Sequence, residues 1–262
     1  MGVEEKAPDF VRELIRGQRR LGAELRALKP DLFVVQSAHW ICTFNWFVTG
    51  QEVHEGVCVA DEAPDLIPGT PYRRTGDPEF AKALVTRLGA AEIPCGLNDS
   101  PHFQWDYGSL VPLQYMDPEA TVPVVLLPSV ICSDLEESLK VGRLVTETAV
   151  ELERRVIFVS SCALSHKLER GPELWPSEAM QRMDRRLLEL LCAGKVEELI
   201  AWMPTYSRDA VAEMGGRTLC GMVGAMAAMA EAGAVSGKQY GPYRQSSGTG
   251  NATVCVTPAP TH

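Results

Sequence analysis

LFVVQS (residues 32–37) is the stretch that decides the fold. It is a short run of apolar and β-branched residues that follows an amphipathic helix expected over residues 8–28. Such a run is typical of a strand that is buried on both faces of a parallel sheet. RVIFVSS (residues 155–161) and TVPVVLLPSVI (residues 121–131) have the same character. We therefore expect each of them to form a further buried strand.

The segments between and after these strands carry apolar residues at helical spacing. We expect further helices over 78–89, 133–155, 176–193, 196–202 and 216–232, and a last strand in NATVCVTP, residues 251–258. Asp77 and Ser133 are the expected N-caps of the first two of these helices, and Gly89 the expected stop. Strands that alternate with helices indicate an α/β fold. We predict a single domain over residues 1–262, with a mainly parallel central sheet flanked by helices.

Composition narrows the classes of function. The 262 residues are 45% hydrophobic and 23% charged, and the net charge is -9. This charge disfavours binding to nucleic acid or to an anionic membrane surface. The opening MGVEEKAPDF is too polar for a signal peptide, and the most apolar stretch, residues 221–235, is interrupted by Glu231. The eight cysteines form no CxxC pair, so we expect reduced thiols and a cytoplasmic protein.

Two histidines follow two of the expected strands. His39 comes just after LFVVQS, and His166 comes just after RVIFVSS. Each ring alone is explained by packing in a core. However, the functional sites of parallel α/β sheets collect beyond the carboxyl ends of the strands. The two equivalent positions therefore favour a shared site over two core rings.

Several motifs of common enzymes are absent from the sequence. There is no GxSxG elbow, no phosphate loop, no GxGxxG and no zincin helix. SSGTG (residues 246–250) is expected to be a tight loop, with a backbone anion nest as the alternative. A hydrolase that uses Ser160 or Ser161 with His166 is the least favoured hypothesis, because no partner acid can be placed.

Four segments together carry a family resemblance. They are SAHW (37–40), DYGSLVPLQYM (106–116), SSCALSHKL (160–168) and SSGTGNATV (246–254). In this order and spacing they resemble the class III extradiol ring-cleavage dioxygenases, the protocatechuate 4,5-dioxygenase catalytic-subunit superfamily. The similarity is greatest to homoprotocatechuate and aminophenol dioxygenases and extends over residues 8–257.

The resemblance implies non-haem Fe(II), held by two histidines and one carboxylate. The open positions of such an ion take a small aromatic substrate, a catechol or an aminophenol, together with O2. By the resemblance, His39 is an iron-binding histidine, Glu213 is the carboxylate and His166 is the acid/base residue. It also implies that Ser165 orients His166, that residues 106–108 line the pocket, and that the protein is a dimer or larger.

The sequence departs from the family pattern at two ligand positions. The family carries its first iron-binding histidine on an N-terminal strand, and no histidine precedes His39 here. This chain lacks that strand, so either the natural protein is longer at its start or the ligand is lost. A gap-free register puts Gly215 at the carboxylate position, and Arg217 would repel a dication. These departures resemble the metal-free subunit of aminophenol dioxygenases. The alternative hypothesis is therefore a non-catalytic subunit that supports a homologous catalytic subunit in a hetero-oligomer.

Overall fold

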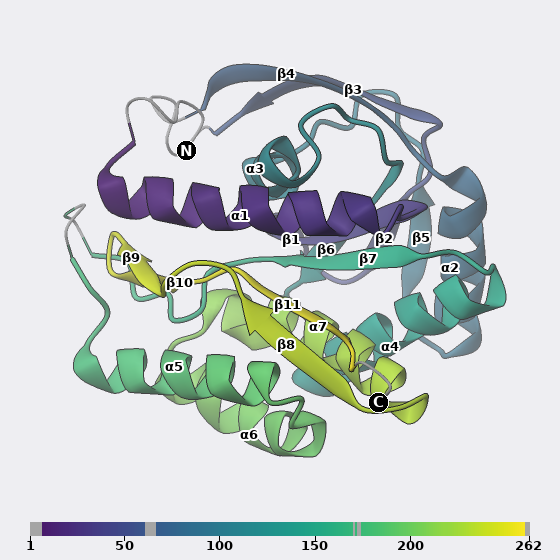
Figure 1. The fold of residues 1–262 in the computed structure, drawn as a ribbon. Helices are drawn as coiled ribbons and strands as arrows, with labels where there is room; N and C mark the ends of the chain where they lie inside the picture. Colours follow the sequence, from purple (N-terminus) through teal and green to yellow (C-terminus); the bar gives the residue numbers. More distant parts are fainter. Residues whose placement is uncertain (1–6, 61–66, 170, 172–173, 260–262) are drawn as a thin grey trace.

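The computed structural model describes residues 7–60, 67–169, 171 and 174–259 (Figure 1). The helices are α1 (Asp9–Ala27), α2 (Pro78–Ala90), α3 (Tyr107–Met116), α4 (Leu135–Glu151), α5 (Glu178–Cys192), α6 (Val196–Asp209) and α7 (Arg217–Glu231). The strands are β1 (Leu32–Cys42), β2 (Trp46–Thr49), β3 (Val53–Val59), β4 (Pro68–Thr75), β5 (Cys95–Asn98), β6 (Val124–Val130), β7 (Val156–Ser161), β8 (Val235–Gln239), β9 (Arg244–Ser246), β10 (Thr249–Asn251) and β11 (Val254–Pro258).

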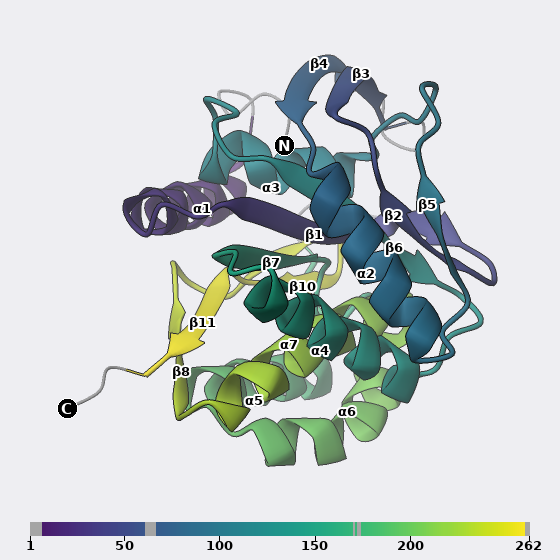
Figure 2. The same ribbon diagram turned by 90° about the vertical axis from the view of Figure 1, so that its right-hand side faces the viewer.

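The three apolar runs form one parallel sheet in the order β6-β1-β7. β1 lies in the middle, with Val34 opposite Val125 of β6 and Phe158 of β7. Its first residues are fully buried, as expected for a strand covered on both faces. Helices flank the sheet (Figures 1 and 2). The α/β class and the parallel sheet are therefore confirmed.

Alternate residues of β1 belong to two different layers of the core. Phe33 and Val35 pack with side chains of α1 and α3. Leu32 and Val34 pack with side chains of α2 and α4. This division follows from the alternation of side chains along a strand. LFVVQS therefore joins the helices on both sides of the sheet.

Glycines let α4 and α7 lie very close together. A Cβ atom on Gly142 of α4 would meet the carbonyl oxygen of Gly221 at 1.8 Å. A Cβ atom on Gly224 of α7 would meet the carbonyl oxygen of Leu139 at 1.9 Å. Figure 2 shows α4 and α7 side by side below β7. The 3₁₀ turn that directly precedes α7 begins with Glu213.

The structure corrects the expected end of the first strand. β1 continues through Cys42, so His39 lies within the strand and not after it. The pairing with β6 is irregular between Gln36 and Ile41. Beyond this irregularity the strand pairs with β6 again, with Ile41 opposite Ser129 and Cys42 opposite Val130.

Two helix boundaries also differ from the expectation. α4 begins at Leu135, and the side chain of Asp134 caps it by accepting from the Glu137 amide. Ser133, the expected cap, instead donates to the carbonyl of Val130. Gly89 does not stop α2, which includes Ala90. The expected N-cap Asp77 is confirmed, because its side chain accepts from Phe80 N.

The SSGTG segment and several short elements differ from the expected loops. SSGTG is the tip of an antiparallel hairpin, in which β9 pairs with β10. Ser247 and Gly248 turn the chain with φ values of 52° and 82°. α6 extends to Asp209, well beyond the expected residue 202. The sequence patterns did not predict β2, β3, β4, β5 or β8, which are short or rich in polar residues.

Two expectations about the whole chain can be compared with the structure. Throughout the described residues, no helix is both long and apolar enough to cross a membrane. All eight cysteines are free. Residues 1–6 of the opening segment, on which the absence of a signal peptide was argued, lie outside the described residues.

Candidate functional site

Three of the residues singled out by the sequence converge on one oxygen atom. Nε2 of His166 lies 3.2 Å from Oε1 of Glu213, and Nε2 of His39 lies 3.5 Å from the same atom. Both imidazoles are about a quarter exposed, with a side-chain exposure of 27%. Glu213 is buried, at 6% exposure. A buried carboxylate between two accessible imidazoles can share protons with them or bind a cation together with them.

β1 and the start of α3 position His39. The amide of His39 donates to Oγ of Ser37 at 3.0 Å, and Ser37 Oγ donates to Oδ1 of Asp106 at 2.6 Å. Asp106 is also the N-cap of α3 and accepts from the Ser109 amide. The ring of Tyr107 lies against the His39 ring, with centroids 4.0 Å apart. The side chain of Asp106 therefore fixes the start of α3 to the strand that carries His39.

Only a glycine fits between these groups. A Cβ atom on Gly108 would meet Ser37 Oγ at 2.5 Å and Cδ2 of the His39 ring at 3.0 Å. Residues 106–108 therefore all lie next to Ser37 or His39. Asp106 binds Ser37, the Tyr107 ring packs at a tilt against the His39 ring, and Gly108 leaves room for both contacts.

A short extended segment, Leu164–His166, carries His166. On one side, the amide of His166 donates to the carbonyl of Val211 at 2.9 Å, and the Glu213 amide donates to Leu164 O at 3.1 Å. On the other side, the segment exchanges two hydrogen bonds with Gly250 of β10, at 2.8 and 2.9 Å. The segment therefore behaves as a strand between residues 211–213 and the SSGTG hairpin.

The chain turns sharply at Glu213. A 3₁₀ turn spans Glu213–Gly216, and three successive residues from Met214 have positive φ values of 50°, 62° and 80°. This turn aims the carboxylate of Glu213 at the end of β7, where Oε2 accepts from the amide of Ala163. The position that a gap-free register assigned to the carboxylate, Gly215, is one of the residues that make the turn.

Arg217 is the first residue of α7 and contacts the turn that carries Glu213. Its Nε donates to the carbonyl of Ser133 at 2.7 Å, and its Nη1 donates to the carbonyl of Met214 at 2.9 Å. Two backbone acceptors therefore hold the guanidinium. Its contacts stabilise the turn that carries Glu213.

The serines at the end of β7 are not arranged as nucleophiles. Ser160 Oγ donates to the carbonyl of Thr218 at 2.8 Å, and Ser161 Oγ donates to the carbonyl of Gly108 at 2.6 Å. Both hydroxyls donate to backbone carbonyls, and neither donates to His166. The hydrolase hypothesis gains no support from this geometry.

The donor types at Glu213 suit a divalent transition metal. Two imidazoles and one carboxylate are the side chains of the facial triad that binds non-haem iron. Among the residues that the structure describes, however, no group of three or more histidine, cysteine or carboxylate side chains is arranged to hold a metal ion. His39 and Glu213 therefore match two of the three ligands of such a triad, and His166 faces the same carboxylate oxygen as His39.

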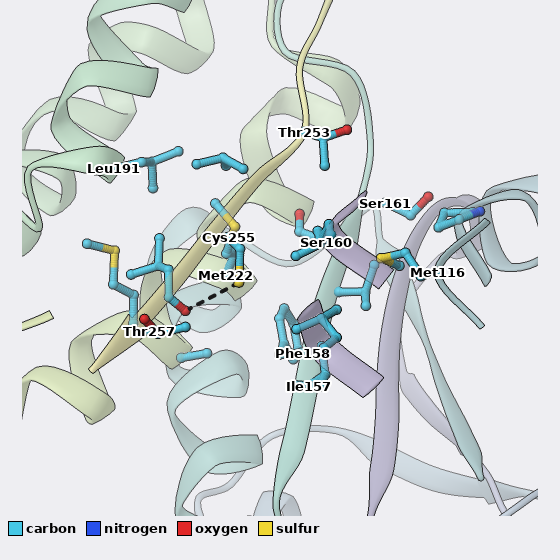
Figure 3. A pocket seen from close by; sticks show the side chains of 18 of the residues that line it. Met116, Ile157, Phe158, Ser160, Ser161, Leu191, Met222, Thr253, Cys255 and Thr257 are labelled. Carbon is cyan, nitrogen blue, oxygen red and sulfur yellow. Dashed lines mark hydrogen bonds between the residues drawn. The ribbon is translucent and has the colours of Figure 1, made fainter. Parts of the chain in front are cut away.

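An apolar cavity of about 370 Å³ lies beside the site but does not contain it. Ile157 and Phe158 of β7 face Met222 of α7 and Cys255 of β11 across it (Figure 3). Burial raises the pKa of the Cys162 thiol, at the end of β7, to about 12. Neither histidine of the site nor Glu213 lines this cavity, so we do not assign it to the chemistry at Glu213.

The family of the chain follows from its similarity to known sequences. Residues 1–256 match the family described as the catalytic LigB subunit of aromatic ring-opening dioxygenase. The chain belongs to this family. This confirms the resemblance noted from SAHW and the three other segments.

Individual relatives give a consistent picture at low identity. The chain is 24% identical over 201 residues to 3,4-dihydroxyphenylacetate 2,3-dioxygenase of Escherichia coli, covering 74% of this chain and 72% of that protein. It is 26% identical over 224 residues to the 2-aminophenol 1,6-dioxygenase beta subunit of Pseudomonas sp, covering 79% and 73%. The alpha subunit of that enzyme is 22% identical over 216 residues and covers 79% of each chain.

A solved structure has the same fold. The crystal structure of an uncharacterized Escherichia coli K12 protein, JW3007, superimposes with a TM-score of 0.67. It covers 92% of this chain and 91% of its own, at 22% identity. This similarity supports the α/β architecture with its parallel β6-β1-β7 sheet.

Asp106 was expected only as part of the pocket lining, and Asp184 was not predicted at all. Asp106 has a recognisable local signal, because aspartate is a preferred N-cap residue, and it caps α3 here. Asp184 lies in the middle of α5 and is fully buried. An acid on the apolar face of an amphipathic helix is the only signal the sequence offers for it.

Proposed function

We propose that this protein is an extradiol dioxygenase that opens the ring of a catechol or an aminophenol with O2, using non-haem Fe(II). The convergence of His39 and His166 on Oε1 of Glu213 is the observation that carries the proposal. It occurs in a chain of the aromatic ring-opening dioxygenase family. The residue types match the chemistry that such a reaction needs.

His39 and Glu213 would hold the metal ion. A bound Fe(II) would supply coordination sites for the aromatic substrate and for O2, and a route for electrons between them. The second oxygen of Glu213 accepts from the Ala163 amide, which orients the carboxylate toward the imidazoles. Such outer contacts fix ligand geometry and are important for metal affinity.

His166 is the proposed acid/base residue. Its Nε2 can accept the proton that a ring hydroxyl or amine loses on binding, and it can return that proton later in the reaction. Imidazole suits both directions near neutral pH. Tyr107, packed against His39, supplies a flat aromatic surface on which a substrate ring could lie.

The substrate class and the assembly are also proposals. The relatives are named for 3,4-dihydroxyphenylacetate and for 2-aminophenol, so we propose an ortho-substituted aromatic ring as the substrate. The 2-aminophenol enzyme is named as two subunits. We accordingly propose an oligomer of this chain, or a hetero-oligomer with a homologous subunit. The free cysteines support a cytoplasmic location.

Metal analysis and O2 uptake test the proposal together. The chain is purified anaerobically, supplied with Fe(II), and mixed with 3,4-dihydroxyphenylacetate and, separately, with 2-aminophenol. We expect bound iron, O2 consumption and a coloured ring-opened product with one of them. His39→Ala should lose the iron, whereas His102→Ala, at an exposed loop histidine, should retain iron and activity. Wild-type protein that binds no iron and consumes no O2 with either substrate would contradict the proposal.

A metal-free supporting subunit is the second candidate. Two observations favour it: no three-ligand metal group is found in the described part of the chain, and the alpha subunit of the 2-aminophenol enzyme is among the relatives. Under this alternative, the chain alone would bind no iron, and adding it to a homologous catalytic subunit would raise that subunit's activity. Iron-dependent turnover by the chain alone would exclude it.

A further inference from the structure

We propose that Asp184 is a positioning residue for His166, and that it acts through Ser165 and the SSGTG hairpin. The inference rests on the proposed function, because it assigns His166 a role in proton transfer. It adds a second buried carboxylate to the site, on the face of the Leu164–His166 segment opposite Glu213. It also gives SSGTG a purpose.

Both carboxylate oxygens of Asp184 accept hydrogen bonds from neighbouring side chains and backbone. Asp184 is fully buried in α5 and accepts four hydrogen bonds. Oδ1 accepts from the Ser165 amide at 3.1 Å and from the Tyr206 hydroxyl at 2.8 Å. Oδ2 accepts from the Ser165 hydroxyl at 2.7 Å and from the Tyr243 hydroxyl at 2.6 Å. Half of these bonds therefore go to the residue directly before His166.

The direction of Ser165 determines the direction of His166. The segment is extended, with bridges from Ser165 to Ala212 and from His166 to Thr249. Successive side chains of an extended chain point to opposite sides. Since Asp184 holds the side chain of Ser165 on one side, the imidazole of His166 is presented on the other, where Oε1 of Glu213 lies 3.2 Å away.

Gly250 explains why the hairpin contains SSGTG. Its backbone exchanges hydrogen bonds with Leu164 and Ser165. A Cβ atom at this position would lie 2.1 Å from Asp184 Oδ2 and 2.5 Å from the Tyr243 hydroxyl. Only a glycine at this position lets β10 pair with the Leu164–His166 segment while Asp184 binds Ser165 of the same segment. The glycine is therefore needed for this contact, and no anion has to be invoked.

The chemistry of the four donors requires a carboxylate. An ionised carboxylate only accepts hydrogen bonds and has room for about four. An asparagine would replace one accepting oxygen with a donating NH2 group. The backbone N–H of Ser165 can only donate, so the remaining oxygen of the asparagine must face it. The new NH2 group would then face the hydroxyls of Ser165 and Tyr243, which donate to Asp184 in the wild type. Asp184→Asn is thus a nearly isosteric change that loosens the hold on Ser165.

Steady-state kinetics of the iron-loaded full chain test the proposal. For Asp184→Asn and for Ser165→Ala, we expect kcat to fall by roughly 10–100-fold, the usual effect of losing an outer-shell contact. KM and iron content should stay at the wild-type values, because His39 and Glu213 are unchanged. The matched control is Ser138→Ala, which also removes a fully buried serine hydroxyl, one that donates to Asp134 O at the start of α4. We expect its kcat to be unchanged.

Hydrogen exchange separates failure of this inference from failure of the proposed function. In the metal-free wild type, the amides of Ser165 and His166 should be protected; in Ser165→Ala and Asp184→Asn they should exchange faster, while Ser138→Ala leaves them unchanged. An inactive wild type would contradict the proposed function but leaves this readout intact. Unchanged exchange at both amides in both variants, or wild-type kcat in both, would overturn the positioning role. Ser165→Ala keeps the test decisive if Asp184→Asn does not fold.

Discussion

Glu213 and Asp184 are two buried carboxylates on opposite sides of the same three-residue segment, and they differ in what surrounds them. Asp184 accepts four hydrogen bonds from one amide and three hydroxyls. Glu213 accepts one amide with Oε2 and presents Oε1 to two imidazoles. A carboxylate whose oxygens accept hydrogen bonds from fixed amide and hydroxyl groups stabilises the structure. One that faces titratable rings is available for chemistry.

The largest expected effect concerns the Glu213 side. His166→Ala should lower kcat by about 100-fold or more, the scale of a lost proton-transfer group. Iron content should not change, because His39 and Glu213 remain. Thermal unfolding should be almost unaffected, since the imidazole is partly exposed. Measuring O2 uptake, iron and Tm on one preparation checks all three. Full activity in this variant would remove the functional distinction between the two carboxylates.

The next effect concerns the Asp184 side and is one of stability. Gly250→Ala should destabilise the protein by about 1–3 kcal/mol, because its Cβ would overlap with Asp184 Oδ2. The matched control is Gly89→Ala in α2, where a Cβ meets nothing within 4 Å. That change should stabilise the helix by roughly 0.5–1 kcal/mol. Urea unfolding of both variants gives the difference, and equal stability would show that the Asp184 cluster adapts freely.

A smaller effect tests the support of the Glu213 turn. Arg217 binds the carbonyls of Ser133 and Met214, so Arg217→Ala should loosen the turn and weaken iron binding by roughly tenfold, as for other outer-shell contacts. Simple charge repulsion predicts the opposite sign. Iron titration of the wild type and the variant decides between them, and tighter binding in Arg217→Ala would mean that repulsion dominates.

The smallest effect is a difference in pH dependence. Burial raises the pKa of Asp184 above its ordinary 3.8, despite its four hydrogen bonds. Burial also acts to raise the pKa of Asp117, but hydrogen bonds from Thr121 and Val122 and the nearby Arg74 outweigh it and lower that pKa. Asp184 has a raised pKa in the folded state, so its contribution to the free energy of unfolding increases as the pH falls from that pKa toward 3.8. Asp117 has a lowered pKa in the folded state, so its contribution decreases as the pH falls from 3.8 through that pKa.

Urea unfolding over a pH series measures this difference. The stability of the wild type relative to Asp184→Asn should rise as the solution is acidified. The stability of the wild type relative to Asp117→Asn should fall. If both differences changed in the same direction, the environments of these two carboxylates would be more alike than their contacts indicate.

The sequence by itself determined the class of the fold and named three residues that the structure brings together. Three β-branched, apolar runs between amphipathic segments require a parallel sheet covered by helices, because both faces of each run must be buried. The local pattern also placed the N-cap Asp77 and His166 after β7, whereas His39 proved to lie within β1. These features depend on neighbours in the chain, which a sequence displays directly.

Tertiary structure alone decided how the carboxylate of Glu213 lies relative to the two histidines. Register in the sequence pointed to Gly215, but three left-handed residues turn the chain so that Glu213 faces the histidines. Asp184 is connected to His166 only through hydrogen bonds between segments 19 or more residues apart. Such contacts depend on the packing of α5, β10 and the end of β7 against one another. No local pattern encodes them, because their energy exists only once the segments meet.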